Sequence, residues 1–451
     1  METKNVPIPK LAFIVLFVSV LVFCDSFSDS SAQGVYARIE IPSSYNPVGS
    51  GARALGMGGA FIAIADDATS ASWNPGGLIQ LERPEVAGVG AYFYRSEDLS
   101  FGTNPEGDGS QSVDMSKVNY ASASYPFTLW DYNMIVSLNY QNLYDFTRDW
   151  EFPLNIDTES LTANQNIGFE SEGQLGAIGL AYCTQITPRL SLGFTLNFWE
   201  DSLYENEWET RVYQNGAGFF SGYPVNYTYR SFDKYNFDGF NANLGFMWNI
   251  TDKITLGGVF KTPFDADLRH KNTTTTTQTF PTAPESDTST STSFSVDETL
   301  DMPMSYGIGF AYRFSDAFSM SADVYRTQWD DFEQKDANGN RTSPVNGKPI
   351  HESGIDATTQ VRLGAEYLII EPKYLVPVRA GLFYDPAPAE GSPDDFYGVT
   401  VGTGLGIGRF IFDIAYQYRF GNDVAEYILE NKEFSMDVDE HTVYASLIIH
   451  F

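Results

Sequence analysis

The stretch FIFDIAYQYRF, residues 410–420, decides the fold class of this chain. Every second position is large and apolar or aromatic: Phe410, Phe412, Ile414, Tyr416, Tyr418 and Phe420. Smaller or polar residues, among them Asp413, Gln417 and Arg419, stand between them. Because side chains alternate between the two faces of an extended strand, this pattern predicts a strand with one apolar and one polar face.

The same alternation recurs outward from this stretch, from residue 85 to residue 451. It predicts fourteen strands, at 85–95, 116–126, 132–144, 173–185, 188–200, 236–249, 252–262, 303–314, 317–330, 357–370, 374–385, 395–406, 409–420 and 440–451. Short and long connections alternate between these strands. The short ones are 127–131, 186–187, 250–251, 315–316, 371–373 and 407–408. The long ones are 96–115, 145–172, 201–235, 263–302, 331–356, 386–394 and 421–439.

Two length classes of connection are typical of an up-and-down barrel that spans an outer membrane, with long loops on one side and short turns on the other. Closure of the sheet pairs every strand edge, as lipid requires. We therefore predict an all-β fold, a fourteen-stranded antiparallel transmembrane β-barrel over residues 85–451, with 96–115, 201–235 and 263–302 outside the cell. The Ser/Thr-rich stretch 273–295 is predicted to be a mobile loop.

The N-terminal residues predict export. Lys4 and Lys10 precede an apolar run at 11–23, and the small residues Ser30 and Ala32 follow. This is the pattern of a secretory signal peptide, which we place at 1–32, with cleavage after Ala37 as the competing site. We expect a multi-pass protein of the bacterial outer membrane.

The charge balance excludes several classes of function. The 451 residues carry 27 Lys and Arg against 58 Asp and Glu, a net charge of −31. This leaves no basic stripe for nucleic acid. The pattern predicts no metal site, no cofactor and no catalytic residues: only two Cys and four scattered His occur, and the GxSxG motif of serine hydrolases is absent. The acidic loops suit contact with lipopolysaccharide through divalent cations, but the favoured interpretation of their charge is the solubility of exposed loops. We expect a monomer among outer-membrane lipids.

Residues 33–84 do not read as a strand and are predicted to form a plug, here called the hatch, inside the barrel. Gly56, Gly58 and Gly59 belong to a run of small residues that suits close packing in a crowded lumen. The motif Asn74-Pro75-Gly76 follows, and its proline predicts a turn that stiffens the end of the hatch.

These segments resemble a known family. GARALGMGGA at 51–60, ADDA at 65–68 and WNPGGL at 73–78 are similar to the N-terminal hatch of the FadL/TodX-like outer-membrane transporters of long-chain fatty acids and aromatic hydrocarbons. Further similarity lies at 305–309, 361–367 and 377–385, so that the resemblance covers the whole mature chain.

The resemblance implies a fourteen-stranded barrel with a hatch and passive, cofactor-free transport. Two departures stand out. The family motif usually reads Asn-Pro-Ala, where this chain has Asn-Pro-Gly. The family also uses a kink in its third strand as a lateral opening, whereas 132–144 holds no Gly or Pro that would mark a bulge.

Charged residues are predicted on the lumen face of several strands. They are Asp323, Arg362, Glu366, Arg379, Asp413 and Arg419. One interpretation is a network in which these charges satisfy one another. The other is that one Arg binds the carboxylate of an amphipathic ligand.

Two functions therefore remain open, and a third is disfavoured. The first is passive transport of a hydrophobic small molecule, a fatty acid or a hydrocarbon, past the hatch. The alternative is an accessory or structural component of a protein-secretion system with a similar hatch. An open general porin is disfavoured, because a hatch would block it.

Overall fold

The computed structural model describes residues 49–157, 161–202, 206–428 and 433–451. Fourteen antiparallel pairings join fourteen strands into a ring, in which β1 pairs with both β2 and β20. In order around the ring they are β1 (Glu85–Phe101), β2 (Gly109–Leu129), β3 (Tyr132–Asp145), β5 (Leu161–Thr187), β6 (Leu190–Trp199), β8 (Tyr223–Asn249), β9 (Ile254–Lys261), β12 (Ser305–Arg313), β13 (Phe318–Thr327), β16 (Thr358–Glu371), β17 (Tyr374–Tyr384), β18 (Tyr397–Ile407), β19 (Phe410–Val424) and β20 (Phe434–His450). The predicted closed barrel of fourteen strands is confirmed.

The alternation in the sequence becomes the two faces of the barrel wall. Leu180, Ile308 and Leu382 are typical of the apolar side chains that point outward and stay exposed. Aromatic residues such as Trp130 and Tyr397 lie toward the two rims of this apolar band. An apolar band between aromatic girdles is the outer surface that a barrel presents to lipid.

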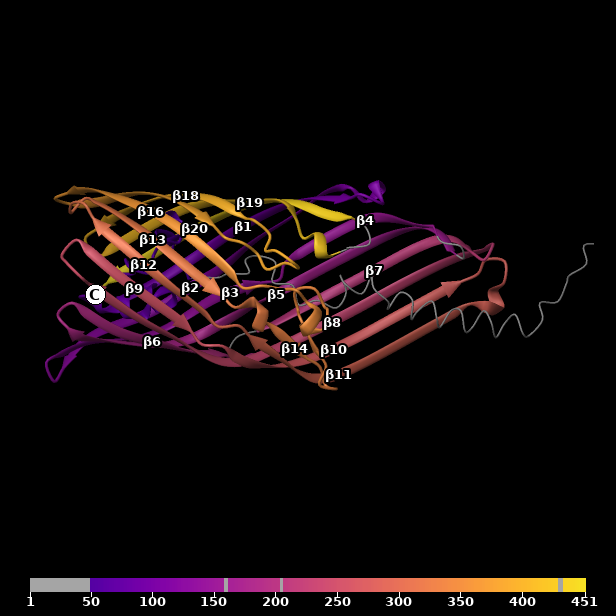
Figure 1. Ribbon diagram of the computed structural model, residues 1–451, viewed down its shortest axis with the longest axis horizontal. Helices are drawn as coiled ribbons and strands as arrows, with labels where there is room; N and C mark the ends of the chain where they lie inside the picture. Colours follow the sequence, from indigo (N-terminus) through magenta and orange to yellow (C-terminus); the bar gives the residue numbers. More distant parts are fainter. Residues whose placement is uncertain (1–48, 158–160, 203–205, 429–432) are drawn as a thin grey trace, which may run out of the picture.

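One side of the barrel continues well beyond the ring as an extension, toward the right-hand end of Figure 1. The strands β5 and β8 are 27 residues long, and only their later halves take part in the ring. Their earlier halves pair with strands outside the ring: β4 (Arg148–Asp157), β7 (Glu207–Phe220) and β10 (Phe264–Thr279). Beyond β10 the sheet goes on into β11 (Thr288–Met302), β14 (Glu333–Lys335) and β15 (Arg341–Thr342). At about 3.3 Å per residue, the earlier half of β5 alone is about 45 Å long.

The extension corrects the prediction of loops. The connections 145–172, 201–235 and 263–302 are largely strands, and the stretch 273–295 is the paired hairpin of β10 and β11 rather than a mobile loop. Thr275 and Thr277 place their hydroxyls 3.1 Å from those of Ser291 and Ser289 across the hairpin. β-Branched Thr favours extended backbone, and paired hydroxyls add cross-strand contacts, so low complexity does not imply disorder here.

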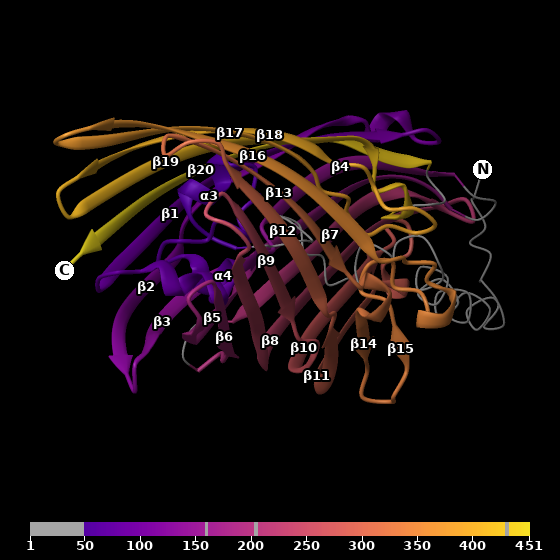
Figure 2. The ribbon, with the colours of Figure 1, turned by 60° about the vertical axis from the view of Figure 1, so that its left-hand side comes forward.

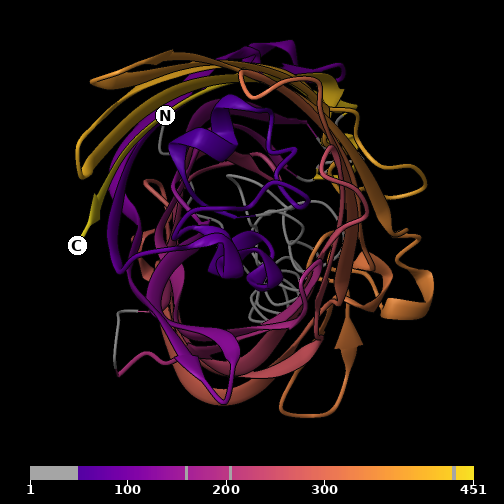
Figure 3. The same cartoon turned by 90° about the vertical axis from the view of Figure 1, so that its left-hand side faces the viewer.

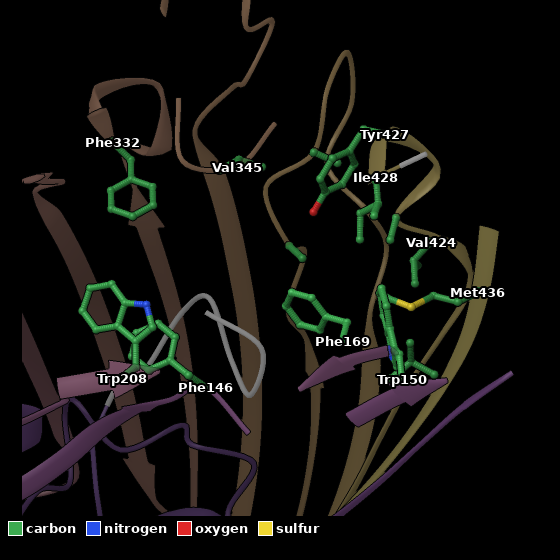
Figure 4. Packing of buried hydrophobic residues seen from close by; sticks show 14 of the residues in the cluster. Phe146, Trp150, Phe169, Trp208, Phe332, Val345, Val424, Tyr427, Ile428 and Met436 are labelled. Carbon is green, nitrogen blue, oxygen red and sulfur yellow. The ribbon is translucent and has the colours of Figure 1, made fainter. Parts of the chain in front are cut away.

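A large apolar cluster lies within the extension and the adjoining ends of the ring strands. Figure 4 shows Phe146 beside Trp208 on one side and Trp150 with Val424 and Met436 on the other. The Phe146 and Trp208 rings stack with their centroids 4.6 Å apart, and Trp208 stacks in turn on Tyr235 at 4.7 Å. The aromatic residues of this cluster are buried, so the extension is a packed structure in its own right.

The described part of the hatch, residues 49–84, lies inside the barrel toward the end with the short turns (Figures 2 and 3). It holds two short helices, α3 (Ala52–Gly56) and α4 (Ser70–Trp73), and a 3₁₀ turn at Pro75–Gln80. Of the residues described, none belongs to a helix long and apolar enough to cross a membrane. The predicted signal peptide, 1–32, falls outside the described residues.

Candidate ligand site between the hatch and the barrel wall

The hatch glycines lie where the hatch meets the wall without space for side chains. A Cβ on Gly56 would stand 3.1 Å from Gly402 Cα, and one on Gly58 would stand 3.0 Å from the Leu363 carbonyl oxygen. Gly58 and Gly59 also have φ of +67° and +72°, which favours glycine. The Gly58 N–H donates to Thr400 Oγ1 at 2.9 Å, so the hatch backbone bonds directly to the wall.

The wall has matching glycines that sequence reasoning missed. A Cβ at Gly193 or Gly245 would collide with the Asn74–Gly76 turn, and one at Gly364 or Gly381 with Met57 and Gly58. These glycines stand on the lumen face of β6, β8, β16 and β17, where other strands carry polar side chains. That position is the signal that could have identified them as a seat for the hatch.

The Asn74 side chain forms hydrogen bonds within the hatch and to the barrel wall. Its Nδ2 donates to the Ile62 carbonyl at 2.8 Å and to the Phe246 carbonyl of β8 at 2.9 Å. Its Oδ1 accepts from the Gly76 N–H at 3.0 Å, at the start of the 3₁₀ turn that opens with Pro75. Asn74 is fully buried, so each of these bonds is made away from water.

The predicted lumen charges form two linked sets, of which the first fastens α3. Arg53 of the hatch pairs with Glu366 at 2.9 Å and with Asp66. Glu366 also accepts from Arg379 at 2.6 Å, and Arg379 donates on to Asp413 at 2.5 Å. The structure therefore brings Glu366, Arg379 and Asp413 together, with a hatch arginine that the sequence did not single out.

The second set joins Asp385, Arg362 and Arg419. Arg362 donates to the Gly58 carbonyl at 3.1 Å and lies 3.6 Å from Asp385. Arg419 pairs with Asp385 at 3.2 Å and with Glu440 at 2.8 Å. Asp323 lies opposite Arg362 on the neighbouring strand, and its Oδ2 accepts the N–H groups of Phe61 and Ile62 at 2.7 and 2.8 Å. Each of these charges is therefore occupied by a partner or by the hatch backbone.

A cavity of about 130 Å³ lies between the hatch and the wall. Its apolar lining includes Leu55 and Trp73 from the hatch and Phe93, Leu143 and Phe383 from the wall. Its polar lining consists of Lys117, Asn119, Asn142, Gln417 and Thr442 together with the paired charges Arg362, Asp385, Arg419 and Glu440. The cavity is thus amphipathic, and an apolar molecule in it would touch both hatch and wall.

The cavity lies against a seam between β2 and β3. Their ladder runs from Leu129 and Tyr132 up to Tyr120 and Gln141, and no further pair joins these two strands in the described part of the chain. Above this point β2 still pairs with β1, and β3 still pairs with β5.

Both strands bulge at the seam. The register shifts at Asn119 on β2 and at Leu143 on β3. The third strand therefore has a bulge although no Gly or Pro marks it, because an ordinary residue can occupy a bulge. Polar side chains cross the seam: Asn119 Nδ2 donates to the Asn142 carbonyl at 3.2 Å, and Lys117 Nζ lies 3.1 Å from Asp145 Oδ2.

A closed barrel with an apolar outer band and a lumen filled by an N-terminal segment defines a channel-type protein of the bacterial outer membrane. Residues 44–425 match the family model described as Outer membrane protein transport protein (OMPP1/FadL/TodX), and the chain belongs to that family. It is an outer-membrane transporter for hydrophobic compounds, and the family is one of transport proteins rather than enzymes. The alternative of a secretion-system component is not favoured.

Solved structures share the fold at low sequence identity. The Pseudomonas putida toluene transporter TodX matches over 92% of this chain and 100% of its own, with 14% identity and a TM-score of 0.54. The Ralstonia pickettii toluene transporter TbuX matches over 90% and 100%, with 13% identity and a TM-score of 0.51. The CymD monoaromatic hydrocarbon channel matches over 90% and 99%, with 16% identity and a TM-score of 0.51. Among curated protein sequences, none matches this chain.

Proposed function

We propose that this barrel carries small, uncharged hydrophobic molecules through the cavity beside the hatch and releases them sideways at the β2–β3 seam. The observation that carries the proposal is the position of the cavity: Asn119, Asn142 and Leu143 line it and also form the seam. Among the described residues, β2 and β3 are joined at this point by the side-chain contacts of Asn119 and Lys117 and no longer by a ladder of backbone bonds.

An uncharged cargo is supported by the state of the lumen arginines. Arg53, Arg362, Arg379 and Arg419 each pair with a carboxylate of the protein. A fatty-acid carboxylate would have to displace one of these partners and leave it unpaired in a buried site, which is costly. The similar structures are named for toluene and for monoaromatic hydrocarbons, which are uncharged.

The membrane surroundings form a further part of the proposal. We propose that one copy is sufficient for transport and that outer-membrane lipid and lipopolysaccharide surround it. The exposed Leu, Ile and Val side chains around the wall support lipid contact, and a single chain closes the ring.

A reversible cross-link across the seam tests the route. Lys117→Cys and Asp145→Cys would be joined by a short bis-methanethiosulfonate reagent, and uptake of labelled toluene and of a labelled long-chain fatty acid would be measured in cells lacking other such transporters. We expect the cross-link to reduce toluene uptake to the background of cells without the protein, and a reducing agent to restore it. Fatty-acid uptake should stay near background throughout.

The control pair is Ser124→Cys with Ser137→Cys. These serines face each other within the continuous part of the same ladder, with their hydroxyl oxygens 2.8 Å apart. A cross-link between these two positions joins strands that are already paired there and leaves the seam unchanged, so toluene uptake should be unchanged. Full toluene uptake with the seam bridged would contradict sideways release, and fatty-acid uptake equal to that of toluene would contradict an uncharged cargo.

A further inference from the structure

Asn119 and Asn142 stand on either side of the seam, at the two bulges, and both line the cavity. Their side chains are 4% and 3% exposed. A molecule that moves from the cavity to the seam passes between them. Donors or acceptors that lack a partner on these two side chains therefore favour molecules that can bond to them.

Both amide nitrogens already have acceptors. Asn119 Nδ2 donates to the Asn142 backbone carbonyl at 3.2 Å, and Asn142 Nδ2 donates to Gln174 Oε1 at 2.7 Å. Because a carbonyl can only accept, the partner of Asn119 also fixes which way round its amide is placed. Neither Asn119 Oδ1 nor Asn142 Oδ1 has a hydrogen-bond partner among the described residues.

These two oxygens need donors. Buried polar atoms are nearly always hydrogen-bonded in native proteins, and one without a partner carries the cost of its lost hydration. Each amide nitrogen has an acceptor for at least one of its two N–H groups, whereas each amide oxygen lacks any partner among the described residues. A ligand that satisfies these oxygens must bring an O–H or N–H group.

The charged groups of the cavity are engaged with one another or with a neighbouring carboxylate: Lys117, the ammonium that crosses the seam, lies 3.1 Å from Asp145 Oδ2. Arg419 donates to Glu440 at 2.8 Å and pairs with Asp385 at 3.2 Å, while Arg362 lies 3.6 Å from Asp385. These charges satisfy one another on the side of the cavity formed by β16, β17, β19 and β20. A carboxylate ligand would bring only acceptors to the two asparagine oxygens, whereas a hydroxyl brings a donor.

We propose that the cargo of this barrel is a small apolar molecule with an uncharged hydroxyl group, a phenol or an alcohol, whose O–H donates to Asn119 Oδ1 or Asn142 Oδ1. Its apolar body lies against Leu143, Phe93 and Trp73. This inference rests on the proposed function, since it assumes that molecules pass through this cavity, and it specifies their chemistry.

The test is a matched series of ligands with one ring and one changing group. Wild-type protein in lipid nanodiscs is saturated with labelled 4-methylphenol, and unlabelled 4-methylphenol, 4-methylanisole, p-xylene and 4-methylbenzoate compete for it, with empty nanodiscs as the background. We expect 4-methylphenol to bind about tenfold more tightly than its methyl ether, a difference of about 1.4 kcal/mol. The carboxylate should compete least.

Two variants locate the effect. Asn119→Leu combined with Asn142→Leu removes both acceptors at similar side-chain size and should abolish the preference for the phenol over its ether. Asn197→Leu is the matched control: Asn197 is 1% exposed and its Oδ1 also lacks a partner among the described residues, but it is not among the residues that line the cavity. The preference should survive in this control.

The outcomes separate the two proposals. Equal binding of the phenol and its ether by the wild type would overturn the hydroxyl assignment and mean that water alone serves the two oxygens. Tighter binding of p-xylene would overturn it as well, yet would leave transport of hydrophobic molecules standing. Failure of all three neutral compounds to bind would defeat the proposed function itself. Heat-modifiable mobility in gels reports whether each variant folds. Where a variant does not fold, the ligand series on the wild-type protein still tests the hydroxyl assignment.

Discussion

Arg379 shows how one side chain can hold several parts of the lumen in place. Its guanidinium joins Glu366 of the neighbouring strand and Asp413 of β19, and Glu366 in turn holds Arg53 of the hatch. Alternation predicted that Arg379 would face the lumen, and one interpretation was that the lumen charges satisfy one another, but the sequence could not predict which carboxylates would pair with Arg379. With Arg53 and Asp66 of the hatch included, the set holds three acids and two bases, which only the folded barrel brings together.

Arg379→Gln should therefore damage the fold more than it damages the recognition of any one ligand. It leaves Glu366 with Arg53 alone and leaves Asp413 buried without its ion-pair partner, and breaking a buried pair in this way costs about 3–5 kcal/mol. Urea unfolding in detergent, followed by the heat-modifiable gel shift, should show the loss. Binding of a neutral hydrocarbon should fall only as far as the folded fraction falls, and a long-chain fatty acid should bind weakly to the wild type and to the variant alike.

The control for this experiment is Arg189→Gln. Arg189 pairs with Asp252 in an exposed position, with side chains 54% and 95% accessible. Exposed pairs contribute about 0–1 kcal/mol, so little change is expected. A selective loss of fatty-acid binding in Arg379→Gln would show that Arg379 recognises a carboxylate after all.

In the extension, a buried histidine between two carboxylates joins β8, β10 and β11 in addition to the backbone hydrogen bonds between these strands. His270 on β10 lies with Nε2 2.9 Å from Asp233 Oδ1 on β8 and Nδ1 3.3 Å from Glu298 Oε1 on β11. Its ring also stacks on Tyr235, with centroids 4.2 Å apart. Burial disfavours the charged imidazolium, but the two hydrogen-bonded carboxylates outweigh burial and raise the pKa of His270 to about 9.

The extension should therefore loosen as the pH rises. A pKa raised on folding stabilises the charged form, so its contribution is complete below the unfolded pKa of about 6.5 and disappears as the pH passes about 9. Hydrogen exchange of β10 and β11 at matched intrinsic rates should show weaker protection at pH 9.5 than at pH 6. In His270→Gln the protection should be lower at pH 6 and nearly independent of pH. Equal pH dependence in wild type and variant would assign the effect to another group.

At the scale of the whole molecule, the sequence was most informative where one physical rule acts along the chain. Alternation and turn lengths predicted the ring of fourteen strands because every wall residue faces either lipid or lumen. The same rule does not predict the extension, because the length of its strands is not set by the thickness of the membrane. For this reason the prediction of a mobile loop at 273–295 was wrong. Alternation does not predict the seam either. The bulges at Asn119 and Leu143 lie where the ladder between β2 and β3 ends, and no particular residue type marks them.

The alternation of long and short connections also predicts the orientation of the barrel in the membrane. The extension carries the long connections, and the opposite rim carries the short turns, so the extension should stand outside the cell. Glu285, in the turn between β10 and β11, and Asp316, in the turn between β12 and β13, are both exposed and mark the two ends. Cys183 is buried, so a newly introduced thiol should be the reactive one. A membrane-impermeant maleimide should label Glu285→Cys on intact cells, and Asp316→Cys only after the outer membrane is permeabilised. Labelling in the reverse order would place the extension in the periplasm.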